Sequence, residues 1–227
     1  MMRCKEVVAE LKSLAKPGAV EGMARFGITA RNTLGVSMPD MRRLAKKAGK
    51  SHELAGELWD TGIHEARIVA GIVDVPGEVT PEQMDSWAAD FDSWDVCDQV
   101  CMNLFDKTPF AYDKCLEWSA REEEYVKRAG FALMACLAWH DKGAPDRAFK
   151  PFFAVITRES TDERNFVKKA VNWALRQIGK RNASLNRQAI ATSEKILKID
   201  SKSARWIARD ALRELTGEAV QNRLKPE

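Results

Sequence analysis

The sequence has no long run of apolar residues, and this absence excludes one class of protein at the outset. Spanning a bilayer takes roughly 20 consecutive apolar residues, and no segment of the 227 residues approaches that length. The opening stretch, MMRCKEVVAELKSLAK, alternates charged and apolar side chains at helical spacing. It lacks the continuous apolar centre of a secretory signal, so we expect neither a membrane span nor an export signal.

Cysteine is also scarce. The five cysteines are Cys4, Cys97, Cys101, Cys115 and Cys136. An odd number within apolar helical patterns favours free thiols over a disulfide framework, which predicts a reducing compartment, the cytoplasm. Cys97 and Cys101 stand four residues apart without further ligands, so apolar packing explains them better than metal binding.

Strand-like alternation of apolar and polar residues is missing as well. Apolar residues recur instead at three- and four-residue spacing along the whole chain, which predicts helix throughout. Residues that favour helix starts stand at Ser37, Ser51 and Thr80, the last with Gln83 at the capping-box position. With 45% hydrophobic and 30% charged residues, the composition is that of a folded protein.

Turn residues divide this helical pattern into short segments. The predicted helical segments cover residues 54–73, 82–105, 110–118, 123–139, 145–157, 162–179 and 184–198. Such segments with short connections are typical of paired-helix repeats near the HEAT length. We therefore predict an all-α fold of HEAT-like repeats forming a curved α–α superhelix, a solenoid, in a single domain over residues 1–227. An irregular helical bundle remains the alternative, because the repeats are degenerate.

Charge is unevenly distributed, although the net charge is only +3. From Thr161 to the end, 15 Lys and Arg face 8 Asp and Glu, a balance of +7, and the preceding residues carry 21 against 25, a balance of −4. A basic C-terminal third indicates a polyanionic partner, although solvated helix faces explain the charge equally well.

The run FDSWDVCD carries the first candidate site. If Asp92 or Ser93 caps a helix here, Trp94 and Asp98 stand four residues apart on one face, so an aromatic ring and a carboxylate share a surface. Favourable interaction with the helix dipole explains some of the acidic residues without catalysis. It explains Asp98 poorly, because Asp98 lies a turn further in.

The run NFVKKAVNWALRQIGK carries the second candidate site. Lys169, Trp173 and Arg176 lie on one stripe of a helix, as phosphate contacts on either side of an aromatic ring would. A core tryptophan with cations extending round it has the same spacing, and spacing alone favours that interpretation. Arg128, which follows Lys127 at the start of another apolar helix, points either into a groove or to solvent, and its position alone does not decide between the two.

Other notable residues have structural explanations. The run HEARI at residues 64–68 begins like a zinc-protease motif but has Ile68 where the second histidine is needed, so no metal site is expected. The remaining tryptophans are predicted to serve the core, and Trp87 is close enough in sequence to the SWD element to support it. These core tryptophans are Trp59, Trp87, Trp118, Trp139 and Trp206.

Four runs together resemble one known family. They are residues 26–76, FDSWDVCDQV, VKRAGFALMACLA and FVKKAVNWALRQIGKRN, which occur in the order and approximate spacing of the DNA alkylation repair enzyme family, the AlkD-type HEAT-like-repeat DNA glycosylases. The resemblance covers roughly residues 5–215. Its specific elements are SWDxxD and KKAxxWxLR.

The resemblance implies a function. It implies a superhelix whose basic concave face binds duplex DNA and removes N3- or N7-alkylated purines, notably 7-methylguanine and 3-methyladenine, without flipping the base. By motif, Trp94 and Trp173 would pack on the deoxyribose of the lesion, and Asp98 would lie beside its C1′. Arg128 would contact phosphate, with Lys127 adjacent.

Further features complete this hypothesis. Lys169, Arg176 and Lys180 are the other cations expected to contact DNA. No metal or nucleotide cofactor, membrane or protein partner is expected, and the protein is expected to be a monomer, cytoplasmic and associated with the nucleoid when bound to DNA. The match is weakest at the phosphate-binding helix that the resemblance implies near the N-terminus. Lys5, Lys12 and Lys16 supply positive charge there, but this stretch has no tyrosine.

Two other hypotheses stay open. One is a non-catalytic repeat protein that binds DNA structures, which differs from the enzyme by not depending on Asp98. The other is a helical-repeat scaffold for protein partners, which the basic C-terminal third argues against.

Overall fold

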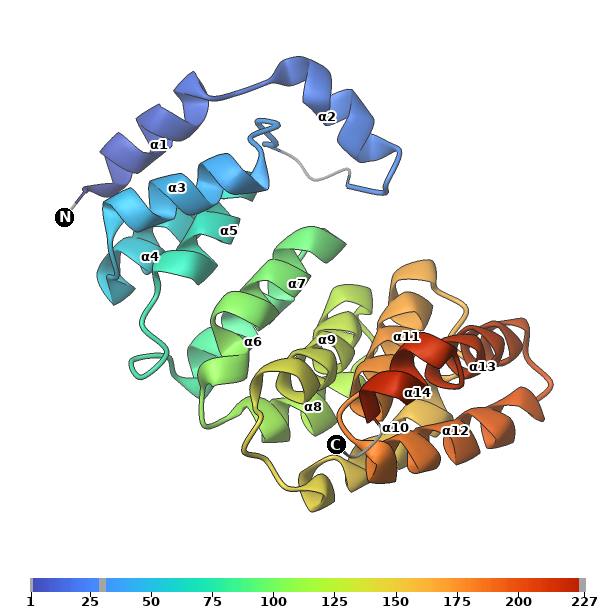
Figure 1. Ribbon diagram of the computed structural model, residues 1–227. Helices are drawn as coiled ribbons and strands as arrows, with labels where there is room; N and C mark the ends of the chain where they lie inside the picture. The colour runs from blue at the N-terminus through green and yellow to red at the C-terminus, as the bar shows by residue number, and fades with distance from the viewer. Residues whose placement is uncertain (1, 29–31, 225–227) are drawn as a thin grey trace. The chain divides into compact units, whose positions relative to one another are not determined.

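The described part of the chain is helical throughout. The computed structural model describes residues 2–28 and 32–224, and these contain no strand (Figure 1). They form two compact units, Met1–Pro109 (unit 1) and Phe110–Glu227 (unit 2), each with its own core. The predicted all-helical class is confirmed, whereas the single domain over 1–227 stays a prediction. Residues 29–31 of the motif at 26–76 lie outside the described residues.

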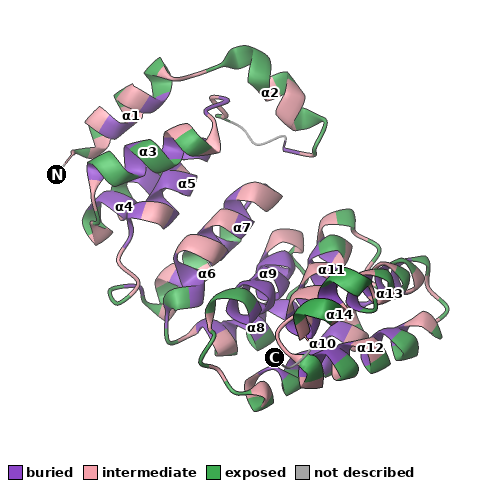
Figure 2. Cartoon of the chain, viewed as in Figure 1, coloured by how far each residue is buried: buried purple, intermediate pink, exposed green. Residues whose placement is uncertain are grey.

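Helix α5 is the centre of unit 1. It packs against α3, α4 and α7, and most of its side chains are buried (Figure 2). The helices of this unit are α1 (Cys4–Ser13), α2 (Pro17–Ala24), α3 (Met38–Ala48), α4 (His52–Asp60), α5 (His64–Val73), α6 (Pro81–Ala89) and α7 (Trp94–Asn103), followed by the short 3₁₀ helix η1 (Phe105–Lys107).

Side-chain caps start three of these helices where the sequence predicts them. Ser37, Ser51 and Thr80 each accept a backbone N–H from the first turn of α3, α4 and α6. The capping box expected with Gln83 is half formed, because the Gln83 side chain donates to Asp74 at 2.8 Å instead of returning to Thr80.

Two of the predicted helical segments contain more than one helix. Residues 54–73 contain α4 and α5, and residues 82–105 contain α6, α7 and η1. In the first, Gly62 adopts a positive φ of 63°, which favours glycine and ends the helical path. In the second, Ser93 is extended before α7. Apolar spacing continues across both breaks, so periodicity alone does not reveal them.

Unit 2 has two layers of helices. Helices α9, α11 and α13 pack in one row, and α8, α10 and α12 contact one another in order or pack against that row. This is the pairing expected of helical repeats. The elements are α8 (Ala111–Ser119), α9 (Glu124–His140), η2 (Asp146–Ala148), α10 (Lys150–Glu159), α11 (Asn165–Gly179), α12 (Ala183–Leu197), α13 (Lys202–Leu215) and α14 (Glu218–Leu224).

The core of unit 2 forms around α9. Most residues of this helix, from Val126 to Ala138, are buried on every side. Gly130 allows α8 to approach it closely, because a Cβ at this position would lie 2.6 Å from the backbone nitrogen of Ser119. The two helices therefore fit only with a residue that lacks a side chain here.

The tryptophans predicted to be core residues divide into two groups. Trp59, Trp87 and Trp118 are buried, as predicted, and the Trp59 and Trp87 rings stack at 4.0 Å. Trp139 and Trp206 are 50% and 41% exposed, so their assignment to the core was wrong. Helical spacing places a residue on a face but does not tell whether a neighbouring helix covers that face.

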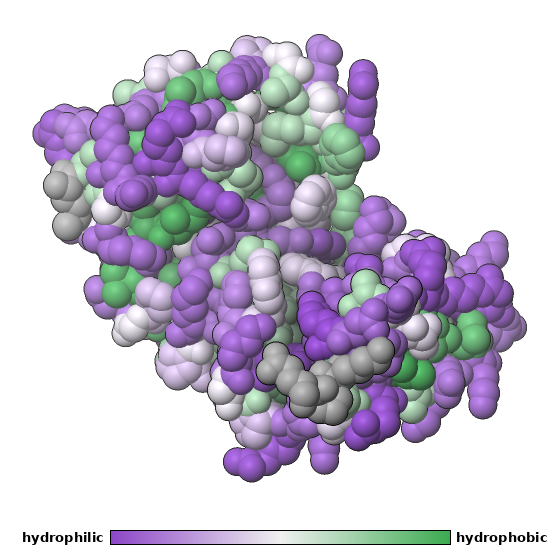
Figure 3. All heavy atoms as spheres, in the orientation of Figure 1, coloured by the Kyte–Doolittle hydropathy of each residue, from purple (hydrophilic) through white to green (hydrophobic). Residues whose placement is uncertain are grey.

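The state of the cysteines agrees with the prediction of free thiols. All five cysteines are free thiols, and only Cys4 is more than slightly exposed. Burial raises the pKa of the Cys115 thiol well above its usual value. Among the described residues, no helix combines the length and hydrophobicity that crossing a membrane requires, and hydrophilic side chains cover much of the visible surface of each unit (Figure 3).

The close contact at Gly130 gives a stability prediction. Gly130→Ala should lower the free energy of unfolding by about 2 kcal/mol, because overpacking against rigid backbone outweighs the better helix propensity of alanine. The matched control is Gly56→Ala in α4, where a Cβ meets nothing within 4 Å, and it should be neutral or raise stability by about 0.5 kcal/mol. Urea unfolding measures both, and equal effects would contradict the packing explanation.

Candidate functional site

Trp94 is the first residue of α7 and is held from outside that helix. Ser93 is the N-cap residue in extended conformation. The Trp94 Nε1–H donates to the carbonyl of Phe26 at 3.0 Å, which fixes the indole against the segment after α2. Trp94 is half-buried and forms part of the wall of a mainly apolar cavity of about 400 Å³. The ring is therefore anchored at one edge and accessible elsewhere.

Asp98 lies one turn further along α7. The two side chains are four residues apart and share a face of the helix. Asp98 is only 9% exposed, and it lies beyond the first turn, so capping does not account for it. A carboxylate at this depth acts in a lower effective dielectric than one in water, which strengthens its interaction with a nearby positive charge.

The start of α7 is fixed to α5 by a buried pair. His64 Nε2 lies 2.9 Å from Asp95 Oδ2, and Ser93 Oγ donates to the other Asp95 oxygen at 2.8 Å. Burial alone lowers the pKa of His64, but the hydrogen bond and charge of Asp95 outweigh it and raise the pKa. For Asp95, burial acts to raise the pKa, and the contacts with His64 lower it overall. The sequence pattern gives no sign of this pair, because its members are 31 residues apart.

Glu65, the second residue of the HEAR run, also has a structural role. Its carboxylate is fully buried and accepts hydrogen bonds from the backbone N–H groups of Leu34, Gly35 and Val36, the shortest at 2.6 Å. It therefore fixes the segment before α3 to α5. His64 and Glu65 are thus both engaged by protein groups, which supports the structural interpretation of this motif.

In unit 2, Trp173 and Lys169 lie on one stripe of α11. Trp173 is half-buried, in contrast to the fully covered Trp118, and Lys169 is exposed. In the described residues, Lys169 forms no ion pair. A cation and an indole are therefore accessible side by side on this stripe.

The adjacent stripe of α11 is bound to α13 by a ladder of polar contacts. Lys168 Nζ lies 5.1 Å from the centre of the Trp206 ring, and Asn172 donates to Asp210 at 2.7 Å one turn later. The contacts advance in the same direction along both helices, so α11 and α13 run parallel. Side chains at positions i and i+4 of one helix therefore meet their counterparts on the other.

Two predicted DNA-contacting cations belong to this ladder. Arg176 and Lys180 donate to the two oxygens of Glu214 at 2.5 and 2.6 Å, and Arg176 also lies 3.4 Å from Asp210. Burial tends to raise the pKa of Glu214, but the two cations lower it overall. Their positive charge is therefore partly neutralised inside the protein.

The other two predicted cations are buried at the start of α9. Lys127 pairs with Glu159 at 2.8 Å and lies 3.8 Å from Asp162. Arg128 donates to the carbonyl of Phe166 at 2.6 Å, which joins the start of α9 to the start of α11. Both side chains of this adjacent pair are therefore engaged by protein groups.

The predicted site residues thus form two groups. Trp94 and Asp98 share a face in unit 1, and Lys169 and Trp173 share a stripe in unit 2. Their meeting in one cleft stays a prediction. The motifs predict these aromatic and acidic residues but give no sign of Glu214, because its partner Lys180 lies 34 residues away along the chain.

The fold of this chain is similar to that of known repeat proteins, and its sequence matches a known family. The whole chain has the fold of a HEAT-like repeat protein, since it aligns with a solved structure described as "A new family of proteins related to the HEAT-like repeat DNA glycosylases with affinity for branched DNA structures". That alignment covers 98% of this chain and 96% of the other, with 22% identity and a TM-score of 0.77. By sequence, residues 7–215 match the DNA alkylation repair enzyme family, and the chain belongs to that family.

Other known repeat proteins are less similar to this chain. A designed armadillo repeat protein aligns over 93% of this chain and 99% of its own, with 14% identity and a TM-score of 0.43. Among curated proteins, none matches this chain.

The His64–Asp95 pair gives a pH-dependent prediction. Because the pKa of His64 is raised, its contribution to stability is complete below about pH 6.5 and is lost as the pH rises through the raised pKa. Because the pKa of Asp95 is lowered, its contribution is present above about pH 4 and is lost as the pH falls through the lowered pKa. His64→Asn should therefore cost about 3 kcal/mol near pH 5 to 6 and less at higher pH.

Urea unfolding of the parent protein and the variant across this pH range measures the difference. His140→Asn, which changes an exposed histidine, is the control and should show little pH-dependent loss. A cost of His64→Asn that stays constant from pH 5 to 9 would contradict a charged pair.

Proposed function

We propose that this protein is a DNA glycosylase that hydrolyses the N-glycosidic bond of N3- and N7-alkylated purines in duplex DNA, without base flipping. The observation that carries the proposal is the shared face of Trp94 and Asp98 at the start of α7, an anchored indole beside a buried carboxylate. Membership in the DNA alkylation repair enzyme family supports it.

The proposed chemistry requires few groups. An N-alkylated purine carries a positive charge, so it leaves with the electron pair of its bond to C1′ without being protonated first. The costly event is the positive charge that develops on the sugar. The Asp98 carboxylate stabilises that charge and orients the water that attacks C1′, and the indole faces of Trp94 and Trp173 favour the developing cation. Water supplies hydroxide to C1′ and releases one proton, and no metal is required.

The cations of unit 2 are proposed to contact DNA phosphates. Lys169 is exposed beside Trp173 and is available without rearrangement. Arg128 and Lys127 are buried, so they contribute to the local potential unless they change their present partners. Arg176 and Lys180 would exchange Glu214 for phosphate oxygens, an exchange between two anionic partners.

A second candidate function is non-catalytic binding of DNA structures. The solved structure that aligns over the whole chain is described as having affinity for branched DNA, and binding alone would not require Asp98. In both cases duplex or branched DNA is the proposed partner. The cytoplasmic location and monomeric state stay predictions.

The two functions are separated by one substitution. Asp98→Asn keeps the size of the side chain and removes its charge, so release of 7-methylguanine and 3-methyladenine from methylated duplex DNA should fall at least about 100-fold. DNA affinity measured by fluorescence anisotropy should change little.

Asp92→Asn removes an exposed carboxylate just before α7 and should leave excision unchanged. No release of alkylated purine by the parent protein, with DNA binding intact, would reject the glycosylase and favour the binding protein.

The carboxylate of Glu214 competes with phosphate in this proposal, which can be tested directly. Glu214→Gln should raise affinity for duplex DNA several-fold and steepen the slope of log affinity against log salt by about 1 to 2, because Arg176 and Lys180 become available to phosphate. Glu218→Gln, an exposed residue on α14, changes net charge equally and is the control. Equal effects of the two substitutions would show that only overall charge matters.

A further inference from the structure

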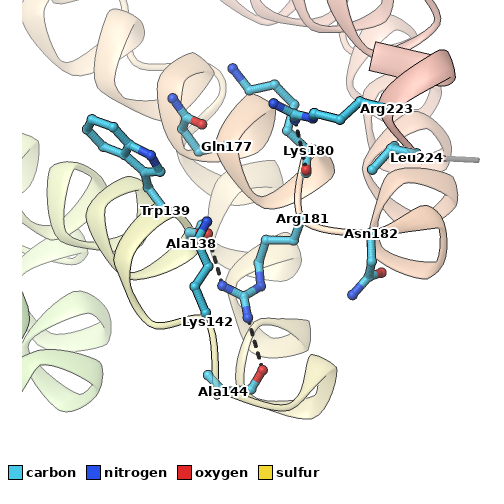
Figure 4. Close-up of a pocket in the computed structure, with 10 residues that line it drawn as sticks. All are labelled: Ala138, Trp139, Lys142, Ala144, Gln177, Lys180, Arg181, Asn182, Arg223 and Leu224. Carbon is cyan, nitrogen blue, oxygen red and sulfur yellow. Dashed lines mark hydrogen bonds between the residues drawn. The ribbon is translucent and has the colours of Figure 1, made fainter. Parts of the chain in front are cut away.

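A cavity at the ends of α9 and α11 is not used by the proposed catalytic site. It has a volume of about 640 Å³ and lies within unit 2, next to α14 (Figure 4). Its lining includes Trp139 and the four cations Lys142, Lys180, Arg181 and Arg223, together with five uncharged residues. Among the described residues, none that lines the cavity has a carboxylate side chain. An aromatic ring among several cations, at this size, is a combination that suits a nucleotide.

Two of these cations have partners within the protein. Arg181 donates to the carbonyls of Ala138, Asp141 and Ala144, the first and last of which are drawn in Figure 4, and it stacks on Phe149. Lys180 is held by Glu214. The Arg181 contacts satisfy carbonyl groups at the C-terminal end of α9, as cations often do there, and the Lys180–Glu214 pair links α11 to α13.

The other two cations that line the cavity are available to bind a ligand. Lys142 and Arg223 are exposed, and neither forms an ion pair with a carboxylate in the described part of the chain. Arg223 uses one nitrogen to donate to the carbonyl of Lys180 at 2.9 Å, and a guanidinium has five N–H donors. Both side chains can therefore bind a phosphate group without breaking an internal ion pair.

The exposed tryptophan also lacks a structural explanation. Trp139 is 50% exposed at the end of a helix that is otherwise almost wholly buried. One side of its ring contacts the ring of His140, 4.8 Å between centres. Trp139 is one of the residues that line the cavity, and half of its surface is open to solvent. Every nucleobase has a flat face that can stack on such a ring.

The cavity is connected to the candidate site along α11. Gln177 lines the cavity and stands four residues after Trp173, which itself stands four residues after Lys169. The three side chains lie on one stripe. A DNA strand whose phosphates follow this stripe would thus reach the cavity directly.

We infer that this cavity binds one unpaired nucleotide of a DNA strand, with its base stacked on Trp139 and its phosphate held by Lys142 and Arg223. The inference rests on the proposed DNA-binding function and adds a specific feature to it, a preference for DNA that has an unpaired end or flap beside the duplex. Stacking and charge attract every nucleotide alike, so binding at this cavity does not depend on the base sequence.

The test compares blunt duplexes with duplexes that carry a short 5′ or 3′ overhang, using fluorescence anisotropy. The parent protein should bind one of the overhang duplexes about five-fold or more tightly than the blunt one, the range that stacking of one base supplies. Trp139→Ala should remove this preference and leave blunt-duplex affinity unchanged. Trp206→Ala removes the other exposed tryptophan of unit 2 and should leave the ratio of the two affinities unchanged.

Two further measurements sharpen the result. A 2-aminopurine in the overhang should lose fluorescence on binding to the parent protein and not to Trp139→Ala, which distinguishes stacking from misfolding. Lys142→Gln with Arg223→Gln should lower the salt slope for overhang DNA by about 1.4. Equal affinity of the parent protein for blunt and overhang duplexes would overturn the inference while leaving the proposed excision chemistry intact.

Discussion

The constraint on which the rest of unit 2 depends is that its row of helices is covered from two sides. Helix α9 packs against α8 and α11, and α11 packs against α9, α12 and α13. Helices packed in this way have one narrow stripe left for polar chemistry. The accessible tryptophans and lysines of the unit are confined to such stripes and to helix ends, so their order in space follows the helical repeat of the sequence.

Internal carboxylates govern the charge on these stripes. A count of lysine and arginine suggests a strongly basic surface, yet Lys127, Arg176 and Lys180 each hold an acidic partner within the protein. Ion pairs of this kind contribute little to stability where water reaches them. They do orient the cations and reduce the positive potential that an incoming polyanion meets, so the basic C-terminal third overstates the free charge of the surface.

Features set by local sequence were predicted well. Caps at Ser37 and Thr80 depend on residues three positions apart, and the helical class follows from spacing alone. The shared face of Trp94 and Asp98 could also be predicted, because both lie on α7. The start of α7 at Ser93 was expected from the FDSWDVCD run, whereas the break at Gly62 within 54–73 was not, since apolar periodicity continues across it.

Features that need two distant elements could not be predicted from one sequence. Spacing identifies the stripe on which Arg176 lies, but not that α13 brings Glu214 against it. It gives no sign that Asp95 meets His64. The exposure of Trp139 likewise depends on where the neighbouring helix ends.

The burial of the thiols has a consequence for a chain of this family. Agents that alkylate DNA bases are electrophiles, and protein thiolates are among the nucleophiles with which they react. Four of the five cysteines are buried, and the raised pKa of Cys115 keeps that thiol protonated. The core of unit 2 therefore presents a poor target at Cys115 to the same reagents that create the damage its family repairs.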